Sequence, residues 1–149
     1  MRLRPILSLL FVTLLLAGAA RAGEKTLFYI HGGAAISGYD AVAYFVSGAA
    51  VQGRPDIAVT WRGAVWQFSN RRNREVFEAN PRAYAPQYGG YCAYGVAQGH
   101  ATGTDPLAWR IVDGKLYLIH NPKLLQAWLS DPAGYIARGD ENWPEALFR

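Results

Sequence analysis

The feature that most limits how this chain can fold is a plan that occurs twice along its sequence. Residues 63–86 align without gaps with residues 114–137, at a constant offset of 51 positions. The aligned pairs join turn residues, helix caps and aromatic side chains: Gly63 with Gly114, Asn70 with Asn121, Pro81 with Pro132, Tyr84 with Tyr135, and Phe77 with Trp128. Agreement of this kind is typical of a chain built from similar structural units.

Each half is predicted to begin with a β-hairpin. Residues 57–68 are rich in β-branched and aromatic residues around Gly63. Residues 109–119 have apolar segments on either side of Asp113-Gly114. Asp-Gly between two apolar segments is a strong short-range signal for a tight hairpin turn.

Helices are predicted after both hairpins. Ser69 is the expected N-cap of a helix that runs to about Ala79, and Asn121 is the expected N-cap of a helix that begins at Pro122. No low-complexity segment or linker divides the chain. We therefore expect a small, single α+β domain in which two pseudo-repeated β-hairpin-plus-helix units surround a shared core.

The segments before the two hairpins also correspond, at an offset of 52 positions. Gly38-Tyr39-Asp40-Ala41 aligns with Gly90-Tyr91-Cys92-Ala93. Asp40 is the expected N-cap of a short helix, and the alignment places Cys92 at the start of an equivalent one. A carboxylate in the first unit thus corresponds to a thiol in the second.

The N-terminus has the pattern of a secretory signal peptide. Arg2 and Arg4 precede an apolar run from Ile6 to Leu16, and Ala20-Arg21-Ala22 has the small-x-small form of a cleavage site. The apolar run is too short for a comfortable membrane span, and no later segment is predicted to cross a membrane. The mature protein is therefore expected in the periplasm or outside the cell.

These signals divide the chain into a signal peptide at 1–22, a leader at 23–35 and a folded domain at 36–149. The whole chain has a formal net charge of +4, but three of its fifteen basic residues lie in the signal peptide. Arg71, Arg72 and Arg74 form a basic cluster without interleaved aromatic residues, which is typical of a solvated helix face. We expect no nucleic-acid partner.

Four motifs rich in glycine and aromatic residues follow one another along the chain. They are Gly38-Tyr39-Asp40-Ala41-Val42-Ala43-Tyr44-Phe45, Trp61-x-Gly63-x-x-Trp66-x-Phe68-Ser69, Phe77-Glu78-Ala79-Asn80-Pro81-x-x-Tyr84 and Tyr88-Gly89-Gly90-Tyr91-Cys92-Ala93-Tyr94. Together they resemble the YHS domain family, most closely its exported single-domain members, over roughly residues 36–143. The resemblance implies a small α+β domain often associated with copper and other soft metals. The paired cysteines of the metal-binding branches are absent here.

The single cysteine is the first candidate for a metal site. Cys92 cannot form an internal disulfide, and a thiolate with imidazole suits Cu(I) or Zn(II). The candidate metal ligands are Cys92, the nearest histidine His100, and Asp40 if the two helix starts lie together. The alternative is a buried, inert cysteine, because free cysteine behaves as a small hydrophobic residue and structural zinc sites normally have four ligands. His31 and His120 are assigned structural roles, His120 in a cap or turn.

Aromatic residues offer a second candidate site. Tyr39, Tyr88, Tyr91 and Tyr94, with Trp61 or Trp66, could line a pocket for a small ligand. The alternative is that these rings fill the core and bond their polar atoms to loop backbone.

Binding is the function that the sequence favours. We expect a metal ion of the copper or zinc type, or a small molecule, to bind near Cys92. The alternative is a structural or protein-interaction module, and a thiol-dependent enzyme comes third. Catalysis by Cys92 with His100 has little support because no third residue is identifiable to orient the pair.

Overall fold

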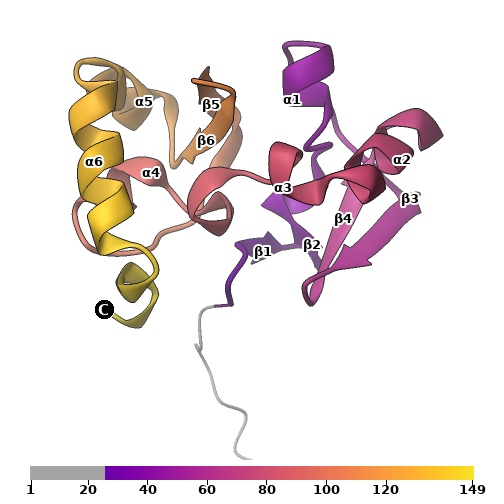
Figure 1. Ribbon diagram of the computed structural model, residues 1–149, viewed down its shortest axis with the longest axis horizontal. Helices are drawn as coiled ribbons and strands as arrows, with labels where there is room; N and C mark the ends of the chain where they lie inside the picture. Colours follow the sequence, from indigo (N-terminus) through magenta and orange to yellow (C-terminus); the bar gives the residue numbers. More distant parts are fainter. Residues whose placement is uncertain (1–25) are drawn as a thin grey trace, which may run out of the picture.

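The computed structural model describes residues 26–149, so the predicted signal peptide lies outside the described residues. The described chain forms an α+β domain, as predicted, with three antiparallel two-stranded sheets. Two hairpin-containing units lie side by side, and residues around α3 connect them (Figure 1). Among residues 26–149, no helix has the length and hydrophobicity needed to cross a membrane.

The first unit begins with a short pair of strands and contains one long hairpin. Its elements are β1 (Ile30–His31), β2 (Ala34–Ala35), the 3-10 turn η1 (Ile36–Gly38), α1 (Ala43–Val46), β3 (Arg54–Trp61), β4 (Ala64–Phe68), α2 (Arg71–Ala79) and α3 (Pro81–Tyr84). Packing begins before residue 36, because Phe28 and Ala35 are buried in the core of this unit.

The second unit has the same order of elements from its 3-10 turn onward. These are η2 (Gln87–Gly90), α4 (Ala93–Ala97), β5 (Asp105–Val112), β6 (Lys115–Ile119), α5 (Pro122–Leu129), α6 (Pro132–Asn142) and η3 (Glu145–Phe148). The strands of the two hairpins begin and end at positions that differ by the predicted offset.

The predicted hairpins are confirmed, and their irregularities correspond. The register of β3 and β4 shifts between Arg54 and Ala58, and that of β5 and β6 shifts between Asp105 and Trp109. Both hairpin turns use a non-glycine residue at positive φ followed by glycine. Such a turn matches the right-handed twist of the strands that it joins.

The expected cap of the first long helix was wrong by one residue. Asn70, not Ser69, is the N-cap of α2, and its side-chain oxygen accepts a hydrogen bond from the backbone N–H of Asn73. The Ser69 hydroxyl instead donates to Asp40. Asn121 caps α5 as predicted, through the backbone N–H of Leu124.

The predicted shared core consists of two clusters that meet at one strand. Along β6, Leu116 and Leu118 pack into the cluster of the first unit, whereas Tyr117 and Ile119 pack into that of the second. Successive side chains of a strand point to opposite faces, so this strand is buried on both sides. The second hairpin therefore packs between the two clusters and contributes side chains to both.

Candidate functional site

Asp40 is a buried structural acceptor in the first unit. Its side chain is fully buried. One carboxylate oxygen, Oδ1, accepts hydrogen bonds from the backbone N–H groups of Val42 and Ala43. The other, Oδ2, accepts from the backbone N–H and hydroxyl of Ser69 and from the Asn73 side chain. Asp40 therefore ties the start of α1 to the junction between β4 and α2.

Cys92 makes the corresponding tie in the second unit. Its Sγ accepts hydrogen bonds from the backbone N–H groups of Gly95, at 3.5 Å, and His120, at 3.2 Å. His120 is the counterpart of Ser69 at the offset of 51, so thiol and carboxylate bind equivalent backbone donors. The thiol is fully buried. This geometry agrees with the capping or turn role expected for His120.

The neighbours explain why a thiol suffices in the second unit. Asn73, which donates its side-chain N–H to Asp40, corresponds to Leu124. The Leu124 side chain has no hydrogen-bond donor, and it lines the same small pocket as Cys92. A weak acceptor such as a thiol is suited to a site with fewer donors and an apolar neighbour.

The predicted metal ligands are only partly brought together. Cys92 and His100 line one pocket of about 160 Å³, together with His120. Asp40 does not line it and is occupied by its own donors. Within residues 26–149, no group of three or more His, Cys, Asp or Glu side chains is arranged to hold a metal ion. The residues as placed do not fit a resident copper or zinc ion, and metal binding stays a prediction from the sequence.

The four predicted pocket tyrosines lie in different surroundings. Tyr39 packs against the first cluster, and Tyr94 packs against Tyr135 with ring centroids 5.2 Å apart. Tyr91 is buried, and its hydroxyl donates to the backbone carbonyl of Thr26. Of the four, only Tyr88 lines a second pocket, which lies between the two units.

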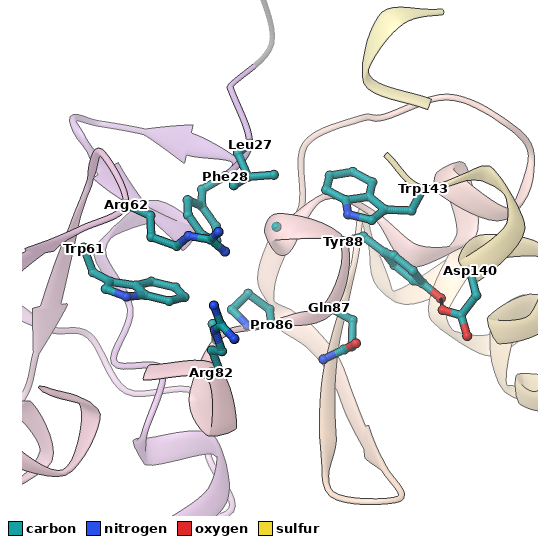
Figure 2. Close-up of a pocket in the computed structure, with 12 residues that line it drawn as sticks. Leu27, Phe28, Trp61, Arg62, Arg82, Pro86, Gln87, Tyr88, Asp140 and Trp143 are labelled. Atoms are coloured by element: carbon teal, nitrogen blue, oxygen red, sulfur yellow. Dashed lines mark hydrogen bonds between the residues drawn. The ribbon is translucent and has the colours of Figure 1, made fainter. Parts of the chain in front are cut away.

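This pocket between the units, called the inter-unit pocket below, has a volume of about 290 Å³. Its aromatic surface consists of two buried residues, Phe28 and Tyr88, and two half-buried ones, Trp61 and Trp143. Figure 2 shows Phe28 and Trp61 on the side of the first unit, facing Tyr88 and Trp143 across the opening. Trp61 is one of the two tryptophans named from the sequence.

Charged side chains surround the aromatic surface. Arg62 and Arg82 extend from the first unit toward the opening, and Asp140 lies on the second unit (Figure 2). All three residues are exposed. The Arg62 guanidinium lies 5.6 Å from the centre of the Trp61 ring, within the range of a cation–π contact.

Tyr88 is fixed at the base of the pocket. Its hydroxyl lies 2.9 Å from Oδ1 of Asp140 and 3.2 Å from the backbone carbonyl of Ile136. Burial, followed by the hydrogen bond to Asp140, raises the pKa of the Tyr88 phenol above its usual range. The phenol therefore remains protonated and donates its hydrogen bond at neutral pH.

Two glycines permit this arrangement by close approach. A Cβ atom at Gly89 would lie 1.9 Å from the carbonyl oxygen of Leu27, so glycine lets the N-terminal segment pass over η2. A Cβ atom at Gly139 would lie 2.5 Å from the Tyr88 hydroxyl. Both close contacts join segments that line the inter-unit pocket.

Sequence reasoning missed Arg62, Arg82, Asp140 and Trp143 as pocket residues. The repeat did not single them out, because the units also differ in charge away from this pocket, for example at Arg74 and Leu125. Arg62 corresponds to Asp113, and Arg82 corresponds to Ala133.

Comparison with known proteins assigns no family. No family model matches the chain, and neither a curated protein nor a solved structure gives a significant match.

Proposed function

We propose that this chain is an exported, non-catalytic domain of the YHS type that binds a small ligand in the inter-unit pocket. The observation that carries the proposal is the set of aromatic rings on both sides of one opening, the half-buried Trp61 with Phe28 and the half-buried Trp143 with Tyr88 (Figure 2). Ligand sites are usually concave and largely apolar, with a few polar groups that fix orientation. Export is supported by the residues at 1–22, and the YHS type by the four motifs.

A binding role suits this pocket better than a catalytic one. Among residues 26–149, its lining contains no cysteine, serine or histidine, and its one carboxylate, Asp140, already accepts a hydrogen bond from the Tyr88 hydroxyl. Cys92 lines a different pocket and is already occupied as a hydrogen-bond acceptor. The groups in the inter-unit pocket can stack on a ligand, donate hydrogen bonds and supply charge.

The proposal is tested by a fragment screen read out by NMR. The five tryptophans supply indole N–H signals within one protein. Ligand in the inter-unit pocket should shift the signals of Trp61 and Trp143. Trp109 and Trp128 are internal references, because neither lines this pocket.

The screen should use the mature chain, residues 23–149, and assign each indole signal by a Trp→Phe substitution. We expect at least one fragment to shift the Trp61 and Trp143 signals in a saturable way. If no fragment of a chemically diverse set does so, or if shifts are confined to Trp109 and Trp128, the proposal is wrong.

A further inference from the structure

We propose that the ligand of the inter-unit pocket is a small carboxylate with a flat apolar body. This inference rests on the proposed function, and names the chemical class of its ligand. The carboxylate would lie between Arg62 and Arg82, and the apolar body between the rings of Trp61 and Trp143.

The charge of the first-unit rim supports a carboxylate. Within residues 26–149, neither Arg62 nor Arg82 forms an ion pair with an Asp or Glu side chain. Both line the opening of the pocket. A guanidinium group presents paired N–H donors that match the two oxygens of a carboxylate. Asp140, on the opposite unit, repels an anion and so favours its placement toward the arginines.

The backbone at Arg62 supplies an independent observation. Arg62 has φ 49°, in the left-handed region that a residue with a long side chain rarely adopts. The corresponding turn residue of the second hairpin is Asp113, at φ 50°, a residue type that tolerates this region. Arg62 and Gly63 form a turn for which Asn-Gly is the preferred pair. An arginine that is unfavourable for the turn is consistent with a role in ligand binding.

The size and walls of the pocket define the apolar body. The volume of about 290 Å³ lies at the lower end of the usual range for ligand pockets, about 300–1,000 Å³. One or two fused rings fill such a space. Trp61 and Trp143 lie on opposite sides of the opening (Figure 2), so a flat body between them can contact both rings.

Matched probes separate the charge from the apolar body. We would compare 2-naphthoate with 2-naphthamide, which have the same rings and differ in charge at pH 7. Binding is measured by the Trp61 and Trp143 indole shifts and by calorimetry. We expect 2-naphthoate to bind about tenfold more tightly, with an advantage that shrinks at high salt because exposed charges are screened.

Variants assign that advantage to the two arginines. R82Q should weaken 2-naphthoate binding roughly fivefold, which is the upper end for one exposed ion pair, and should leave 2-naphthamide unchanged. R62N should weaken 2-naphthoate similarly while raising the urea midpoint of unfolding, because Asn suits the turn. R72Q is the control, because Arg72 is exposed on α2 and does not line the pocket.

The outcomes distinguish this inference from the proposed function. If both probes bind equally and R62N with R82Q has no effect, the pocket binds ligands but not through a carboxylate, and this inference is overturned. If neither these probes nor any other fragment perturbs Trp61 and Trp143, the proposed function itself fails.

Discussion

Replacing Asp40 by asparagine should remove a large part of the stability of the first unit. Asp40→Asn keeps the size of the side chain but replaces one acceptor oxygen by an NH₂ group. Two backbone N–H groups bond Oδ1, and three donors from Ser69 and Asn73 bond Oδ2. Whichever way the amide turns, buried donors then face another donor. Hydrogen bonds to charged groups are worth about 1.5–3 kcal/mol each, and they are not additive, so we expect a loss of about 3–5 kcal/mol.

Urea unfolding of residues 23–149 at pH 7 measures this loss, with far-UV circular dichroism as the signal. Asp113→Asn is the matched control, because Asp113 is exposed in a turn and asparagine tolerates its positive φ. The control should stay within about 0.5 kcal/mol of the parent protein. A loss below about 1 kcal/mol for Asp40→Asn would refute the view that this carboxylate organises the first unit.

Three further predictions concern the second unit and the contact between the units. Cys92→Ser should keep the fold at a cost of about 1–2 kcal/mol in urea unfolding, because the hydroxyl still accepts from the His120 N–H, and a larger loss would contradict the capping role. Native mass spectrometry of both forms tests the metal site predicted from the sequence, and a stoichiometric copper or zinc lost with the thiol would support it. Gly139→Ala should weaken binding of 2-naphthoate in the inter-unit pocket, because the added Cβ would displace the Tyr88 hydroxyl. The indole signal of Trp143 should report this displacement, because its ring packs against Tyr88. Burial raises the pKa of Tyr44 above its usual value of 10.0, so the folded state should lose stability as the pH rises above about 10. Tyr44→Phe should make the urea midpoint of unfolding fall less steeply with pH, and an unchanged pH dependence would exclude Tyr44 as the cause.

The fold was predictable from sequence where local chemistry determines it. Asp113-Gly114 fixes a hairpin turn, and Asn121 with Pro122 fixes a helix start, so both appear where expected. The cap at Ser69 was misassigned because two adjacent residues can both cap a helix. Which one does so depends on Asp40, which is 29 residues away in the chain and binds the Ser69 hydroxyl.

The division of the core could not be read from one sequence in the same way. Residues 116–119 are apolar in the pattern of a strand buried on both faces, but that pattern does not say what covers each face. In the structure Leu118 contacts the cluster of the first unit and Ile119 that of the second. The position of the second hairpin between the two core clusters is therefore a result of packing.

The candidate site lies where the two units stop resembling each other. Their agreement explains Asp40 and Cys92 as equivalent hydrogen-bond acceptors. The single thiol is thus explained by its structural role, and no bound ligand is needed to account for it. Residues at equivalent positions in the two units, such as Asp40 and Cys92, therefore stabilise the fold. The pocket residues behave differently: Trp61 corresponds to Val112, Arg62 to Asp113, and Tyr88 to Ile36. Each is larger than its counterpart or differs from it in charge, and all three line the inter-unit pocket. The ligand that we propose would explain these differences together, whereas stability alone would favour an asparagine at Arg62.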